Sequence, residues 1–251
     1  PRTTFLSVHS PFSVGNSQHG GGLRLVNDEF GIFSNQQFSL QYAYKLKLGE
    51  GKLSIGTTIG FSNIVFKGDS VHLVKSDYFN PAQDPIIPTN SVSGMGLDLG
   101  LGIYYSTKDW YVGMSVLHLP ETSIQLGDVG DFFTKRLYTV SGGYNFELKN
   151  PDYKLKTSAL IITDLISWNP NVSLLLDYKD KYWGGLSGRL DAVSFLLGMR
   201  ILNGLMIGYS YDLPTTTIIA VSHGSHELCL GYEFSLAFDK KNKKYKSVRI
   251  L

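Results

Sequence analysis

Charged side chains recur at one parity of five consecutive strand-like segments in the C-terminal half of the chain. They are Asp177, Arg189, Arg200, Asp212 and Glu227. Because successive side chains of a strand alternate between its two faces, these five are expected to share one face. Opposite charges on neighbouring strands can pair. One interpretation is therefore a ladder of salt bridges that fills an interior and fixes the strand register. The alternative is a charged constriction or a ligand site inside a barrel.

A second group of reactive residue types lies in the segment "HGSHE", residues 223–227. Ser225 stands between His223 and His226 and close to Glu227, which suggests a hydrolase at a barrel's outer surface or, less directly, a zinc site. A nucleophile needs its base within hydrogen-bond reach. Ser225 and His226 are neighbours on a strand and point to opposite faces, so they cannot serve each other there. We therefore favour a polar loop that enters a strand, and expect no catalytic residue, no metal and no cofactor.

The segments that carry these residues alternate between apolar and polar side chains. In "QFSLQYAYKLKLGEGKLSIGTTIGFS", residues 37–62, the apolar side chains share one parity on each side of a short glycine-containing turn. About thirteen such segments follow one another, each close to the 9–11 residues of a tilted membrane strand. They are Thr3–Ser10, Gly20–Val26, Gln37–Leu48, Lys52–Phe66, Gly94–Ser106, Trp110–His118, Lys135–Leu148, Tyr153–Thr163, Asn171–Tyr178, Tyr182–Arg189, Ala192–Ile201, Leu205–Leu213 and Ser225–Leu236.

The lengths of the connections between these segments also form a pattern. The first two are expected to be of medium length, and from residue 49 onward every second connection is a tight turn. The tight turns are Gly49–Gly51, Thr107–Asp109, Lys149–Asp152, Lys179–Lys181 and Leu202–Gly204. The long connections are Lys67–Ser93, Leu119–Thr134 and Pro214–Gly224. Alternate connections of antiparallel strands leave from opposite edges, so tight turns and long loops are sorted as in an outer-membrane barrel.

The composition fits such a barrel. Charged residues make up 18% of the 251 residues, below the roughly 25% of soluble domains. The net charge of +2 gives no reason to expect nucleic acid as a partner. No apolar run reaches the roughly 18 residues of a membrane helix. Aromatic residues such as Tyr178, Tyr182 and Trp183 flank the tight turns, which indicates an interfacial girdle or, alternatively, plain strand propensity.

These patterns predict an all-β fold, a transmembrane antiparallel β-barrel of about fourteen strands. About thirteen are visible, and parity places one more upstream of residue 1, in a longer precursor. The barrel is expected to comprise residues 1–238, followed by a basic periplasmic tail, residues 239–251. In the long loop, Tyr78, Phe79, Ile86 and Ile87 are candidate partner contacts, although packing within the loop explains them equally well.

Several segments together resemble the PorP/SprF-like membrane proteins of the type IX secretion system. The resemblance covers nearly the whole chain and rests on "TTFLSVHSPF", "GGGLRLVNDEFGIFSNQQFSLQYAYKLKLGEGKLSIGTTIGFS", "GLDLGLGIYYSTKDWYVGMSVLHLPE", "RLYTVSGGYNFEL", "YWGGLSGRLDAVSFLLGMRILNGLMIGYSYDL" and "GSHELCLGYEF". It implies a non-catalytic outer-membrane protein that acts in secretion and, in gliding bacteria, in delivering or retaining adhesins at the cell surface.

The implied partners are secreted clients with a C-terminal sorting domain, other secretion components, a peptidoglycan-associated periplasmic protein and outer-membrane lipids. External loops would hold the client, while the turns and the C-terminus would face the periplasm. We therefore expect a component that docks or anchors secreted surface proteins. The alternative is an outer-membrane channel or a transporter of hydrophobic ligands.

Overall fold

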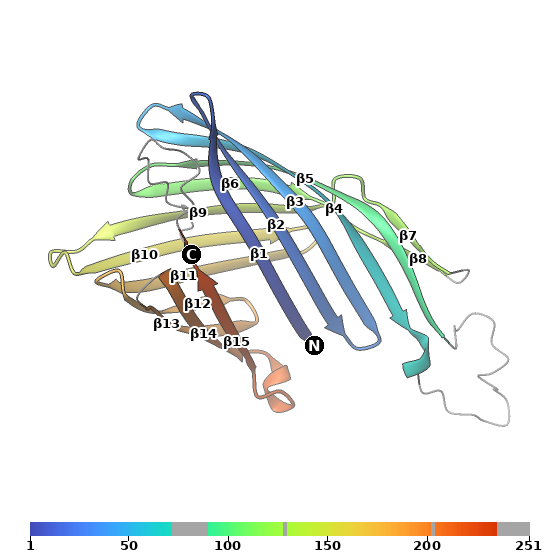
Figure 1. Ribbon diagram of the computed structural model, residues 1–251. Coiled ribbons are helices and arrows are strands. Elements are labelled where there is room, and N and C mark those ends of the chain that lie inside the picture. Colours follow the sequence, from blue (N-terminus) through green and yellow to red (C-terminus); the bar gives the residue numbers. More distant parts are fainter. Residues whose placement is uncertain (72–89, 128–129, 202–203, 235–251) are drawn as a thin grey trace, which may run out of the picture. The chain divides into compact units, whose positions relative to one another are not determined.

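The computed structural model describes residues 1–71, 90–127, 130–201 and 204–234 (Figure 1). Thirteen strands form one antiparallel sheet, in which each strand pairs with the next strand of that sheet along the chain. They are β1 (Arg2–Val14), β2 (Ser17–Phe30), β3 (Phe33–Leu48), β4 (Gly51–Lys67), β5 (Ser91–Ser106), β6 (Trp110–Leu117), β9 (Leu137–Glu147), β10 (Tyr153–Thr163), β11 (Trp168–Tyr178), β12 (Tyr182–Arg189), β13 (Ala192–Arg200), β14 (Leu205–Pro214) and β15 (Ser225–Tyr232). The predicted all-β class is confirmed, and this meander of long strands is consistent with a transmembrane β-barrel.

The chain forms two compact units. The first comprises Pro1–Leu46, Ser54–Ile103 and Ser115–Leu137. The second comprises Lys47–Leu53, Tyr104–Met114 and Tyr138–Leu251. Short 3-10 turns include η1 (Gly68–Ser70) and η4 (Thr217–Ala220), and in the described part of the chain no helix is long and apolar enough to span a membrane.

Tight turns join many of the strands, and their residues explain why the chain reverses there. Gly15, Gly31 and Gly49 each occupy the first turn position with a positive φ near 60°, which the type II′ hairpin turn requires. The turn between β11 and β12 instead places Lys179 and Asp180 at positive φ. The first two connections, residues 15–16 and 31–32, are therefore tight turns, and the prediction of medium-length connections is wrong.

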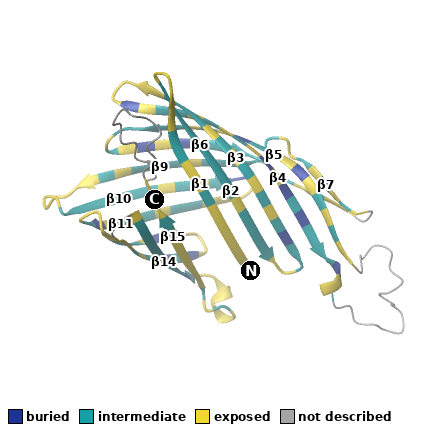
Figure 2. Ribbon diagram, in the orientation of Figure 1, coloured by how far each residue is buried: buried dark blue, intermediate teal, exposed yellow. Residues whose placement is uncertain are grey.

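Along strands such as β3, β5, β6 and β11, exposure alternates in the opposite sense to a soluble protein (Figure 2). In the second unit, Leu197 of β13 is 63% exposed, whereas Ser187 of β12 is only 6% exposed. In the first unit, Met95, Leu97 and Leu101 of β5 are exposed between buried or half-buried glycines. We call the exposed side of each strand its apolar face and the other its polar face. Large exposed apolar surfaces mark contact with a partner or a membrane, so hydrocarbon is the medium that this arrangement suits.

A second, two-stranded sheet lies within the long connection between β6 and β9. Its strands are β7 (Ser123–Leu126) and β8 (Gly130–Phe133). Ile124 is almost fully buried against Gly94 and Gly96 on the polar face of β5. Thr122 Oγ1 also donates a hydrogen bond of 2.7 Å to the Leu97 carbonyl oxygen. This connection was predicted to be a loop; its hairpin is fixed to β5 through Gly94 and Gly96, which leave room for Ile124.

Candidate functional site on the polar face of the second unit

Asp177 is the centre of an ion-pair network close to the tight turn between β11 and β12. Its side chain is 2% exposed. Oδ2 lies 3.1 Å from Lys156 Nζ and 3.4 Å from Arg200 Nη1, while the buried Oδ1 has no hydrogen-bond partner. A buried carboxylate is tolerated when cations and donors compensate for its lost hydration. We call Lys156, Asp177 and Arg200 the turn-side cluster.

Trp183 completes the surroundings of this cluster because the strand register places it between β11 and β13. Asp177 pairs with Trp183, and Trp183 pairs with Gly198. The guanidinium carbon of Arg200 lies 5.4 Å from the centre of the Trp183 ring. Gly198 has no side chain, and a Cβ there would collide with the indole. The glycine therefore creates the space in which the tryptophan lies beneath the arginine.

Exposed ion pairs continue from the turn-side cluster to the turn itself. Lys154 Nζ lies 2.8 Å from Asp180 Oδ2, and Lys179 Nζ lies 3.5 Å from Asp152 Oδ2. The hydrogen bond from Lys154 holds the pKa of the Asp180 carboxyl below its usual value, although partial burial opposes that shift. These contacts stiffen the hairpin ends, but each exposed pair contributes only about 0–1 kcal/mol.

The other predicted charges lie at the opposite end of the strands. Arg189 Nη1 is 3.4 Å from Asp212 Oδ2, and Arg189 Nε is 3.2 Å from Asp191 Oδ1. Glu227 accepts a hydrogen bond of 3.3 Å from the Ser210 hydroxyl. We call Arg189, Asp191 and Asp212 the loop-side cluster. The five predicted residues are thus divided between two clusters and one separate hydrogen bond, and their paired charges resemble structural braces more than a catalytic group.

The "HGSHE" segment has its own hydrogen-bond partners. His226 Nδ1 is 2.6 Å from the Tyr209 hydroxyl, and the Tyr211 hydroxyl donates a bond of 2.5 Å to the His223 carbonyl oxygen. Ser225 and His226 occupy adjacent positions of β15, where side chains point to opposite faces. Over the described ranges, no three His, Cys, Asp or Glu side chains are grouped closely enough to hold a metal ion.

Two other predicted features lie outside the described residues. The partner contacts Tyr78, Phe79, Ile86 and Ile87 fall within residues 72–89, and the basic tail, residues 239–251, falls within residues 235–251. Both stay predictions.

Sequence reasoning missed a group of exposed aliphatic side chains in the connections at the loop-side ends of the second unit's strands. Ile166 is 74%, Leu190 75% and Val221 87% exposed. They belong to the β10–β11, β12–β13 and β14–β15 connections, which in an antiparallel meander leave from the same edge. With Leu165, Ile218 and Ile219, which are also exposed, we call them the apolar loop group. These residues lie outside the strand periodicity; the signal that could have found them is the composition of "DLIS" and "TTTIIAVS", which is unusually apolar for connections.

The comparison with protein families agrees with this architecture. The family model described as "Type IX secretion system membrane protein PorP/SprF" matches residues 1–232. No curated protein matches the chain.

Proposed function

Because the chain belongs to the PorP/SprF family of type IX secretion system membrane proteins, we propose that it docks or anchors secreted surface proteins at the outer face of the outer membrane. Clients with a C-terminal sorting domain, including the adhesins of gliding cells, are the class of cargo that this role implies. The apolar loop group carries the proposal. Exposed apolar patches mark interaction surfaces, and these six side chains lie in connections that leave one edge of the sheet rather than on the strands.

The orientation of the chain is part of the proposal. The loop-side ends would face the cell exterior and present the apolar loop group to the client. The tight turns of the second unit carry charged residues such as Lys108, Lys149 and Lys181 instead. This edge would face the periplasm, where secretion components and a peptidoglycan-associated protein are the expected partners.

The packing of the polar faces favours a platform over a pore. In the second unit, Asp177 and Trp183 fill the space near the turns. In the first unit, the β7–β8 hairpin covers glycines of β5 and leaves Phe133 exposed. Single-channel recording of the purified protein tests this point, because steady ion conduction would instead support the channel or transporter alternative.

Affinity purification from native membranes tests the docking role. We expect a secreted protein to co-purify with the wild type and to be lost from the double variant Ile166→Asn, Val221→Asn. Leu148→Asn is the matched control, since it removes an exposed leucine near a tight turn of the same unit. Recovery of neither a secreted protein nor a secretion component with the wild type would overturn the proposal, as would equal recovery with the double variant.

A further inference from the structure

Three tyrosines line up across neighbouring strands on the apolar face of the second unit, beside the tight turns. Tyr153 pairs with Tyr178, and Tyr178 pairs with Tyr182. The first two rings are 4.9 Å apart between centroids. Aromatic rings in this arrangement mark the level at which hydrocarbon gives way to lipid headgroups.

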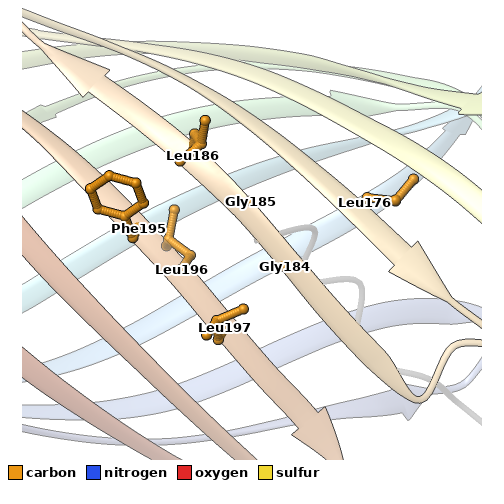
Figure 3. Close-up of a pocket in the computed structure, with 7 residues that line it drawn as sticks. All are labelled: Leu176, Gly184, Gly185, Leu186, Phe195, Leu196 and Leu197. Atoms are coloured by element: carbon orange, nitrogen blue, oxygen red, sulfur yellow. The ribbon is translucent and has the colours of Figure 1, made fainter.

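A hollow in the apolar face begins one step further along the strands. Gly184 follows Tyr182 by two residues on the same face, and in the register it stands between Leu176 and Leu197. Because Gly184 has no side chain, a gap remains between the flanking leucines. The resulting hollow of about 450 Å³ is lined by Leu176, Gly184, Gly185, Leu186, Phe195, Leu196 and Leu197 (Figure 3). Its size falls within the roughly 300–1,000 Å³ of ligand-binding clefts.

Two lysines flank the tyrosines at the turn. Lys179 Nζ lies 5.2 Å from the Tyr178 ring centre, and Lys181 Nζ lies 5.2 Å from the Tyr182 ring centre. Lys179 is already 3.5 Å from the carboxylate of Asp152. For Lys181, the described part of the chain offers no carboxylate within ion-pair distance, so its ammonium group is available to an external anion.

From this arrangement we infer a phospholipid-binding site. One acyl chain lies in the hollow at Gly184, and the lipid phosphate binds the Lys181 ammonium beside Tyr182. Three residues of strand separate Lys181 from Gly184, which is about 10 Å. The headgroup layer on each side of a bilayer is roughly 5–8 Å deep. A lipid whose phosphate lies beside Lys181 can therefore extend its acyl chain to the hollow at Gly184. The inference depends on the strands spanning a membrane and is independent of client docking.

Native mass spectrometry of the detergent-purified protein with added phosphatidylglycerol tests the site. We expect the wild type to retain one phosphatidylglycerol molecule and to retain little diacylglycerol, which has the same chains without the phosphate. Lys181→Gln should weaken retention about tenfold, as expected for the loss of one charge-assisted contact. Gly184→Leu should abolish it by filling the hollow; a Cβ there would lie 3.2 Å from Leu197 Cδ2, a side chain exposed enough to move.

Two control variants separate the site from general effects. Gly188→Leu introduces the same side chain four residues along the same face of β12, where a Cβ would meet nothing within 4 Å. Lys108→Gln removes another exposed turn lysine, which already pairs with Glu147 at 3.0 Å. Both should retain the lipid. The inference is overturned if Gly188→Leu lowers retention as much as Gly184→Leu, if diacylglycerol is retained equally, or if Gly184→Leu instead dissolves a dimer of this chain.

Discussion

Asp177 of β11 and Arg200 of β13 form an ion pair across the intervening strand, with Trp183 of β12 beneath the guanidinium. The pair is possible because Gly198 leaves room for the indole beside β13. A contact between second-neighbour strands fixes the register of all three strands at once. This relationship leads to the first two predictions.

Replacing Asp177 with alanine should destabilise the protein by about 2 kcal/mol, since it leaves Lys156 and Arg200 facing each other without their anion. The figure lies below the 3–5 kcal/mol of a fully buried pair because both cations are partly exposed. Urea unfolding in lipid vesicles measures it. Asp191→Ala, which removes a 67%-exposed partner of Arg189, should cost no more than about 1 kcal/mol. Equal effects of the two variants would contradict the central role of Asp177.

Substitution of Gly198 by alanine should displace the Trp183 indole, because a Cβ at that position collides with the ring. Overpacking of this kind costs about 1–3 kcal/mol. The unfolding midpoint and the Trp183 fluorescence spectrum both report it, with the other two tryptophans replaced by phenylalanine. Gly188→Ala should change neither signal, since that position opens onto free space. An unshifted spectrum in Gly198→Ala would show that the indole lies elsewhere.

The Asp180 carboxyl provides a pH test. Its pKa is held below the usual 3.8, chiefly by the hydrogen bond from Lys154, so the folded state favours the carboxylate. The stabilisation is therefore fully present above about pH 4–5 and disappears as the pH falls through the lowered pKa. The difference in unfolding free energy between wild type and Asp180→Asn should be constant from pH 7 to pH 5 and shrink as the pH falls further. For this exposed pair it should not exceed about 1 kcal/mol. A difference that grows on acidification would contradict this assignment.

Ile124 should control how firmly the β7–β8 hairpin is held. Ile124→Ala removes the side chain that fills the space beside Gly94 and Gly96, at a local cost of about 2–5 kcal/mol. We expect faster trypsin cleavage after Arg136, whose Nε donates a hydrogen bond of 3.0 Å to the Leu119 carbonyl at the base of the connection. Ser123→Ala, on the exposed side of the same hairpin, is the control. Unchanged cleavage of Ile124→Ala would show that the hairpin is held by other contacts.

Most of the strands could be predicted from the sequence. Strands β10 and β12 have the predicted bounds because tight turns or polar connections delimit them clearly. The first strand was predicted too short: it continues past Ser10 to Val14, because its pairing with β2 extends as far as Val14 and Ser17. The β7–β8 hairpin was missed because its strands are only four residues long and too short to show a period.

The charged residues show what parity can and cannot predict. Parity assigned Asp177, Arg189, Arg200 and Asp212 to one face, and their ion pairs agree with that assignment. Parity does not say how far along its strand a residue lies. Asp177 lies two residues before its turn, whereas Arg189 lies at the far end of β12. Counting residues from each tight turn would have separated the two clusters, but the Trp183–Gly198 packing depends on side-chain contacts that no sequence pattern shows.

The central claim is that the apolar faces of the strands meet hydrocarbon. Spin labels on single cysteines placed in turn at residues 37–42 of β3, in a Cys229→Ser background, test it in lipid vesicles. Labels at Phe38, Leu40 and Tyr42 should be reached preferentially by oxygen dissolved in the bilayer, and those at the intervening positions by a water-soluble nickel chelate. Preferential access of the nickel chelate to Phe38, Leu40 and Tyr42, or the absence of alternation, would contradict the account.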